Sequence, residues 1–333
     1  MSRCAIVLVL CLSACTDATD EMVTSPWESV STTLDDGSIV IQKVSYRSGG
    51  LRIFGQICRP AGAGPFPLIV ANHSGVTGLP SWGGGPCAET ARAGKIQIES
   101  SYRGQDGSGG YVELCLGEVD DVLHMLDLAL TLPEVDRNRV AMWGSALGGC
   151  ITTRALQRGA PVKAAASLYG ITDMKTAYEF WSAQLTVGSG PLAQYKQLID
   201  LANAGIGGPP ADYPEDYMRR STLEHAAEIP SSTPYLIAHG MSDLLVPARQ
   251  SCELAQRLGV QGHHFDDQHN LLTTAPTGCE SLWTASTAPI SSWTDNRYLL
   301  VYDGVASALV DAAPAISAAM EADVTSFLTA HLR

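Results

Sequence analysis

Apolar runs of strand length alternate with helix-period segments from residue 39 to the C-terminus, and this alternation constrains the fold most. Residues 68–72 form a run that is apolar up to Asn72, which is typical of a strand buried on both faces. Val119, Val122 and Leu126 recur at helical spacing with acidic side chains between them. Alternating strands and helices form a mostly parallel sheet with helices on both faces. The sequence therefore predicts an α/β fold.

Eight strands and two interruptions are expected within one domain that covers residues 28–333. The strand ranges are 39–46, 51–58, 68–72, 95–99, 140–142, 164–169, 235–239 and 298–302, and the first two form a hairpin. Residues from about 173 to 233 break the alternation and are expected to form a small cap. Residues from about 261 to 297 show little periodicity and are expected to form a loop insertion.

The N-terminus resembles that of an exported bacterial lipoprotein. Arg3 precedes a short apolar run over residues 5–12, which is too short to span a bilayer. Leu12-Ser13-Ala14-Cys15 resembles the lipobox, in which signal peptidase cuts before a cysteine that carries lipid. We expect a signal peptide over residues 1–14, lipid on Cys15 and a flexible tether over 15–27, with an uncleaved membrane anchor as the alternative. The expected location is the cell envelope, at the outer membrane or periplasm.

The charge balance limits the partners. The chain carries 21 basic and 34 acidic residues, a net charge of −13. An acidic surface disfavours binding to nucleic acid and electrostatic adhesion to anionic lipid. Contact with the membrane is therefore expected through the lipid anchor only, and the sequence leaves the oligomeric state open.

Six cysteines lie beyond Cys15, and an envelope location permits disulfides between them. The pairs Cys87–Cys115 and Cys252–Cys279 are the first hypotheses. The second pair would hold the 261–297 insertion against the preceding helix. Six buried thiols acting as small apolar side chains are the alternative.

Five stretches together resemble the α/β-hydrolase branch that contains dienelactone hydrolases and the catalytic domains of prolyl oligopeptidase-type peptidases. The resemblance covers nearly the whole chain after the tether. The stretches are Ser45 to Gly50 with Cys58-Arg59-Pro60 and Gly64-Pro65-Phe66-Pro67, Asn72 to Gly75, Ser101 to Gly110, Arg139 to Gly149, and His239 to Pro247. The resemblance implies a serine hydrolase that acts on ester or peptide bonds without a cofactor or metal.

The fourth stretch covers the nucleophile elbow, whose pattern is G-x-S-x-G. The elbow holds its serine on a strained strand-to-helix turn, so the residues two before and two after must be tiny. Gly144 and Gly148 fill those positions, which puts Ala146 at the nucleophile position. Alanine has no group that can attack a carbonyl.

A catalytic triad also needs an acid and a histidine, and the sequence keeps the family's residue at only the first of these two positions. Asp243 stands where the acid of this family orients the catalytic histidine, although a turn aspartate that binds its own backbone is the alternative. The segment from Leu299 to Leu309 resembles the family's last strand, and the histidine position falls on Ser307. A serine hydroxyl cannot accept a proton at neutral pH as imidazole can.

The oxyanion hole depends on backbone N–H groups, which Ala146 does not affect. Leu147 after the elbow and Ser74 in the turn after the third strand are its expected donors. A pocket that keeps these groups but lacks its reactive ones is a binding site. The sequence therefore predicts a pseudoenzyme that binds a small ester- or peptide-like ligand.

Two further hypotheses stay open. The first is an active carboxylesterase or peptidase with a rearranged site, in which Ser145 is the nucleophile or a histidine among His263, His264 and His269 is the base. The second is a metal-assisted hydrolase that uses the cluster of potential ligands over residues 263–269. That cluster lacks a second set of ligands elsewhere, which favours a solvated polar loop.

Overall fold

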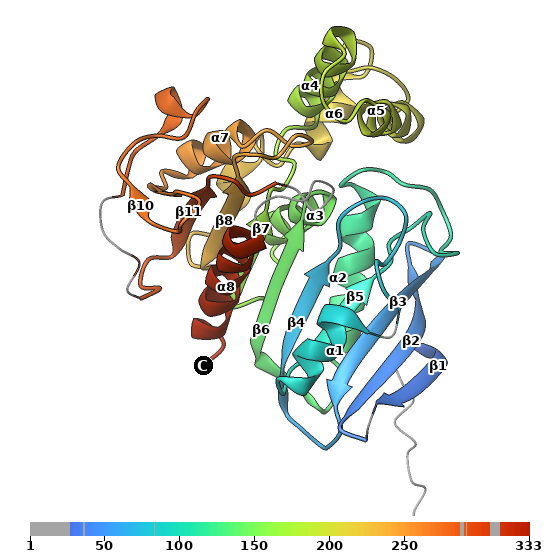
Figure 1. Cartoon of the computed structure of the whole chain (residues 1–333). Coiled ribbons are helices and arrows are strands. Elements are labelled where there is room, and N and C mark those ends of the chain that lie inside the picture. Colours follow the sequence, from blue (N-terminus) through green and yellow to red (C-terminus); the bar gives the residue numbers. More distant parts are fainter. Residues whose placement is uncertain (1–26, 36, 83, 287–289, 291, 307–313) are drawn as a thin grey trace, which may run out of the picture.

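The protein, seen as a computed structural model, is described over residues 27–35, 37–82, 84–286, 290, 292–306 and 314–333 (Figure 1). Its strands are β1 (Glu28–Asp35), β2 (Ile39–Ser48), β3 (Leu51–Pro60), β4 (Phe66–Asn72), β5 (Ile96–Ser100), β6 (Val135–Ser145), β7 (Ala164–Leu168), β8 (Tyr235–Gly240), β9 (Gly262–Phe265), β10 (Leu271–Leu272) and β11 (Arg297–Tyr302). Its helices are α1 (Gly85–Arg92), α2 (Gly117–Ala129), α3 (Leu147–Gln157), α4 (Met174–Val187), α5 (Leu192–Ile206), α6 (Pro214–Arg220), α7 (Arg249–Leu258) and α8 (Pro314–Ala330), with short 3-10 turns η1 (Ala226–Glu228) and η2 (Glu280–Leu282).

All the described strands form one sheet in the order β1-β2-β3-β5-β4-β6-β7-β8-β11-β9-β10. The strands from β5 to β9 in this order run parallel, and β1–β3 and β10 are antiparallel to their neighbours. The predicted α/β-hydrolase fold is confirmed, with eleven strands in the described part of the chain instead of the eight expected. β9 and β10 lie in the expected loop insertion, and strands of four and two residues are too short to show periodicity.

Helices cover both faces of the sheet, as the alternation predicts. α1 and α8 lie in front of it in Figure 1. The buried faces of α2, α3 and α7 belong to one large core cluster, and α8 packs on a second cluster on its own side. The parallel strands end at one common edge of the sheet, where open α/β folds bind their ligands.

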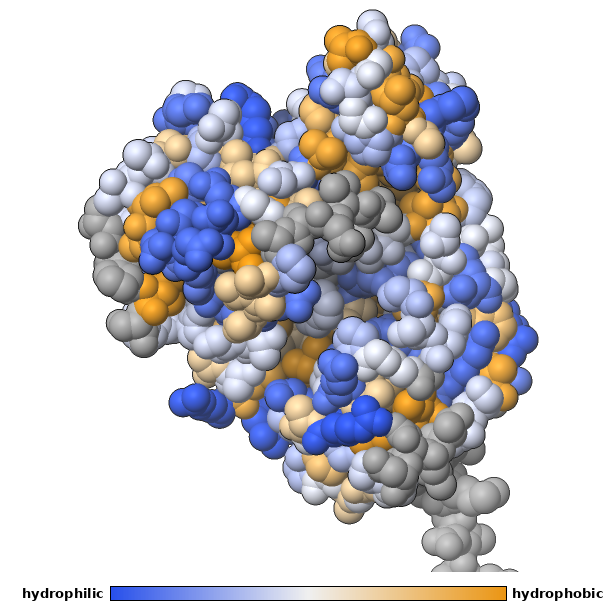
Figure 2. Space-filling view, viewed as in Figure 1, coloured by the Kyte–Doolittle hydropathy of each residue, from blue (hydrophilic) through white to orange (hydrophobic). Residues whose placement is uncertain are grey.

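The segment between β7 and β8 folds into α4, α5 and α6, which lie over that edge (Figure 1). Hydrogen bonds hold this cap from below. Arg220 of α6 donates to the carbonyl of Glu113 in the loop before α2, and also to the carbonyl of Gly205 of α5 within the cap. Figure 2 shows apolar side chains on the outside of this segment, where Val187 is 69% exposed and Met218 is 49% exposed.

Three disulfides form among the described residues, of which the sequence predicted one. Cys252–Cys279 joins α7 to the loop before η2, with Cα atoms 6.0 Å apart, and is confirmed. The predicted pair Cys87–Cys115 is wrong, because the bridges are Cys58–Cys87 and Cys115–Cys150. α1 packs directly on β3, which brings Cys87 against Cys58. Cys115 instead lies beside the first turn of α3.

Two predicted positions, Cys15 and Ser307, lie outside the described residues. Among the residues that are described, no helix is both long enough and apolar enough to cross a membrane.

Candidate active site

The turn from β6 into α3 has the strained backbone of a nucleophile elbow. Ala146 stands between the strand and the helix with φ of 49° and ψ of −112°. An L-residue other than glycine adopts a positive φ only at a cost of about 1–3 kcal/mol. The backbone N–H of Ala146 donates to Leu168 and its carbonyl accepts from Cys150, so both sides of the turn are fixed.

The two flanking glycines are required by close backbone contacts. A Cβ on Gly148 would lie 2.0 Å from the carbonyl oxygen of Asn72. A Cβ on Gly144 would lie 2.2 Å from the carbonyl oxygen of Gly148. No side chain fits at either position, so the elbow is centred on Ala146 as the glycine spacing predicts.

Ser145 points away from the nucleophile position. Neighbouring residues of a strand point to opposite faces, so Ser145 shares a face with Trp143, which packs on the α8 cluster. Its side chain is buried, and its hydroxyl lies near the phenol of Tyr169, whose pKa it helps to set. Burial raises the pKa of Tyr169. A buried hydroxyl on the face of β6 that packs towards α8 is poorly placed to act as a nucleophile.

The turn after β4 lies against the start of α3, because Gly148 contacts the carbonyls of both Asn72 and His73. The two expected oxyanion donors, Leu147 and Ser74, therefore lie on adjoining segments. His73 stacks on Tyr102 with ring centroids 4.1 Å apart, and burial lowers the pKa of this histidine. His73 is thus a neutral, packed side chain beneath the turn.

Asp243 lies in the turn after β8, two strands from the elbow. Its side chain is completely buried. Oδ1 accepts from the N–H groups of Leu245 at 2.8 Å and Val246 at 3.0 Å, as a turn aspartate does. Oδ2 accepts no hydrogen bond from the described residues. The two bonds to Oδ1 orient the carboxylate, and Oδ2 has no hydrogen-bond donor among the described residues. An acid whose role is to orient a histidine would be arranged in this way.

The three histidines proposed as an alternative base contact residues other than those of the elbow and Asp243. His264 bonds to Asp303 at 3.0 Å and to the carbonyl of Thr274, and His269 bonds to Asp323 of α8 at 2.9 Å. His263 is buried on β9 and contacts the ring of Tyr298. No group of three potential metal ligands occurs in the described part of the chain. The predicted cluster over residues 263–269 therefore does not converge on one point.

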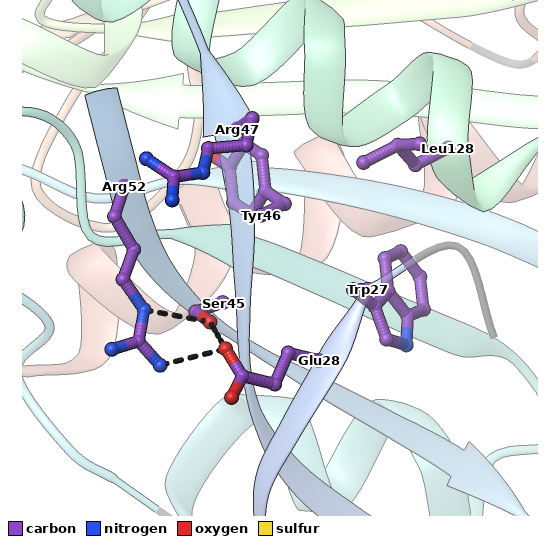
Figure 3. A pocket seen from close by; sticks show the side chains of 7 residues that line it. All are labelled: Trp27, Glu28, Ser45, Tyr46, Arg47, Arg52 and Leu128. Atoms are coloured by element: carbon purple, nitrogen blue, oxygen red, sulfur yellow. Dashed lines mark hydrogen bonds and ion pairs between the residues drawn. The ribbon is translucent and has the colours of Figure 1, made fainter. Parts of the chain in front are cut away.

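A separate pocket of about 490 Å³ lies at the N-terminal hairpin, away from the elbow (Figure 3). Its lining combines Trp27 and Leu128 with two arginines. Arg52 is paired with Glu28 at 2.8 Å, and Arg47 donates to the carbonyl of Gly50. None of its lining residues has a buried side-chain polar atom without a partner in the described structure. This pocket shows no chemistry that demands a ligand.

Sequence reasoning missed two features of the site. Tyr169 has a positive φ of 40° at the end of β7, and only the folded backbone reveals such a conformation. Cys115–Cys150 fastens the first turn of α3 to the loop before α2. The position of Cys150 four residues after Ala146 was a usable signal, because it places the cysteine one turn into the elbow helix.

Comparison with known proteins agrees with this geometry. The chain is 24% identical over 216 residues to the uncharacterized peptidase YtmA of Bacillus subtilis (strain 168), covering 65% of this chain and 78% of that protein. It also matches dipeptidyl peptidase family member 2 of Caenorhabditis elegans at 28% identity over 195 residues, which is 53% of this chain and 21% of that protein.

Solved structures share the fold. An acylaminoacyl peptidase of Pyrococcus horikoshii aligns with a TM-score of 0.56 and 20% identity, over 81% of this chain and 38% of that chain. An acetyl xylan esterase of Paenibacillus sp. R4 aligns with a TM-score of 0.59 and 18% identity, over 89% of this chain and 87% of that chain. Several peptidases of this group are thus much longer than this chain.

The family match covers the part of the chain that builds the site. Residues 90–271, more than half of the 333 residues, match the prolyl oligopeptidase family (Peptidase_S9). That range includes the elbow, the cap and the turn that carries Asp243. This chain therefore belongs to the prolyl oligopeptidase family of serine hydrolases.

Proposed function

We propose that this protein is a catalytically inactive member of its family, anchored in the envelope by lipid, whose pocket binds an ester- or peptide-like ligand without cleaving it. One observation carries the proposal. Ala146 occupies the strained position between Gly144 and Gly148 at which the family's nucleophile stands. A methyl group there can neither attack a carbonyl nor form an acyl-enzyme.

The size of the rate loss expected without a triad residue supports inactivity over slow activity. Removing the serine or the histidine of a catalytic triad lowers turnover about a million-fold, and the two losses do not add. Oxyanion donors and binding alone retain roughly 10³ to 10⁴ over the reaction in water. Ser145 does not substitute, because its hydroxyl is buried against Tyr169.

A fluorophosphonate probe tests the proposal on the folded protein. We expect no label on the wild-type chain, and turnover of p-nitrophenyl acetate no faster than background protein-catalysed hydrolysis. The Ala146→Ser variant with Ser307→His should gain label at residue 146, and either single change should gain almost none, because nucleophile and base act as a unit. Labelling of the wild-type chain at Ser145 would instead support a rearranged, active site.

The envelope location is the second half of the proposal. It is supported by the sequence Leu12-Ser13-Ala14-Cys15 and by three disulfides, which persist in oxidising compartments. The expected outcome is that the wild-type protein partitions into the detergent phase of an extraction and that Cys15→Ala moves it to the aqueous phase. A Cys15→Ala protein that stays in the detergent phase would contradict lipid attachment, whatever the probe shows about activity.

A further inference from the structure

The net charge of −13 is distributed unevenly along the chain. Residues 37–88 contain four basic residues and no acidic one, although acidic residues outnumber basic ones by 34 to 21 in the whole chain. The four are Lys43 and Arg47 on β2 and Arg52 and Arg59 on β3. These two strands are neighbours near one edge of the sheet (Figure 1), so they give an acidic protein a local excess of positive charge.

Two of these arginines face each other across the hairpin. Arg47 pairs with Arg52 in the register of β2 and β3, so both side chains lie on the same face of the sheet. Like charges directly opposite each other destabilise a sheet. The carboxylate of Glu28 lies 2.8 Å from Arg52 and neutralises it. Among the described residues Arg47 donates only to the carbonyl of Gly50 and forms no ion pair, so one guanidinium of the pair lacks a counter-charge.

The pocket at the hairpin offers room and access beside this pair. Its volume of about 490 Å³ lies within the range of small-molecule sites. Its buried polar atoms are satisfied, but its charged side chains are open to solvent, since Arg52 is 47% exposed and Glu28 is 69% exposed. Figure 3 shows Arg47 and Arg52 on one side of the pocket and Trp27 and Leu128 on the other. Such a lining suits an anion that is joined to an apolar group.

We propose that this pocket binds the phosphate group of an anionic phospholipid and thereby holds the hairpin against the membrane surface. The planar fork of a guanidinium matches two oxygens of a phosphate. This inference rests on the envelope location proposed above and adds a second contact with the membrane. Cys15 precedes Trp27 by 12 residues, which span at most about 43 Å. A lipid on Cys15 would therefore keep Trp27 within that distance of the bilayer.

The short range of electrostatic forces allows this contact in spite of the net charge. At an ionic strength of about 0.1 M the screening length is about 10 Å, so a phosphate in the pocket interacts mainly with the charges that line it. Each basic residue close to an anionic membrane strengthens binding about fivefold. Glu28 already occupies Arg52 and competes with the phosphate for it. The unpaired Arg47 should therefore contribute most.

Co-sedimentation with vesicles tests the inference on the full chain with Cys15→Ala, so that no attached lipid brings the protein to the membrane. We expect binding to phosphatidylglycerol vesicles at an ionic strength of about 0.1 M and far less binding to phosphatidylcholine vesicles. Arg47→Gln should lower the vesicle-bound to free ratio about fivefold. The control Arg257→Gln removes an equal charge at an exposed position of α7 and should leave the ratio unchanged. Equal losses in both variants, or no binding to phosphatidylglycerol, would overturn the inference.

Removing the competing carboxylate should have the opposite effect. Glu28→Gln frees Arg52 and should raise the bound to free ratio about fivefold, whereas Glu215→Gln, at an exposed position of α6, should not change it. Binding of inorganic phosphate in calorimetry without binding of vesicles would overturn the lipid as the source of the phosphate. The vesicle assay uses a chain without lipid, so its failure refutes this inference alone. The detergent partition of the wild-type chain decides separately whether Cys15 carries lipid.

Discussion

Glycine at the elbow should make the protein more stable, although the same change destabilises an ordinary helix. Ala146 has φ of 49° and ψ of −112°, a region that costs a residue with a side chain about 1–3 kcal/mol. Ala146→Gly removes that strain. Glycine also gives the unfolded chain more conformational freedom, which lowers the free energy of unfolding by about 0.4–1 kcal/mol. Loss of a half-buried methyl group costs about 0.4 kcal/mol, half the value for a fully buried one.

These terms leave a net stabilisation of about 1 kcal/mol. The control is Ala183→Gly, at an exposed position within α4, where ordinary helix propensity predicts a loss of about 1 kcal/mol. The assay is urea unfolding of both variants and the wild type, with the slope of the transition checked for constancy. If Ala146→Gly lowers the free energy of unfolding as much as Ala183→Gly does, the elbow is not strained and the reasoning fails.

Three further outcomes are expected. Burial lowers the pKa of His73, so the unfolded chain binds the proton more tightly and the free energy of unfolding should fall as pH decreases below about 6.5. The variant His73→Phe should show a smaller fall of the urea midpoint with decreasing pH than the wild type. An equal fall in both proteins would contradict the prediction. Replacing Cys252 and Cys279 together by serine opens a loop with a sequence separation of 27 and should cost about 3 kcal/mol by calorimetry, whereas a loss near zero would exclude a stabilising bridge. Gly148→Ala places a Cβ 2.0 Å from a backbone oxygen and should cost about 1–3 kcal/mol or more, whereas Gly84→Ala, with nothing within 4 Å, should be tolerated far better in the same thermal melt.

Local spacing was sufficient to predict much of the fold and the centre of the elbow. Strand and helix periods indicate which backbone groups pair, so the alternation from residue 39 onward predicted a mostly parallel sheet covered on both faces. The glycine spacing around Ala146 reports steric contacts of the backbone itself. A Cβ at Gly144 would overlap the carbonyl of Gly148 within the same turn, so this part of the pattern can be predicted from local backbone geometry, whereas Gly148 is required by its contact with Asn72 at the end of β4.

Contacts between segments that are distant along the chain could not be predicted from the sequence. Cys87 pairs with Cys58 because α1 packs on β3, and no local pattern states which helix covers which strand. β9 joins the sheet through β11, although its four residues are too few to show a period.

The same division applies to the chemistry of the site. The sequence by itself determined that alanine stands at the nucleophile position, because the elbow is a local turn with fixed spacing. Only the tertiary structure decided that Ser145 turns to Tyr169 and that Oδ2 of Asp243 has no donor within the described residues. The direction of a side chain and the occupancy of its hydrogen bonds depend on neighbours contributed by other strands and by the cap. Those neighbours come together only when the sheet forms.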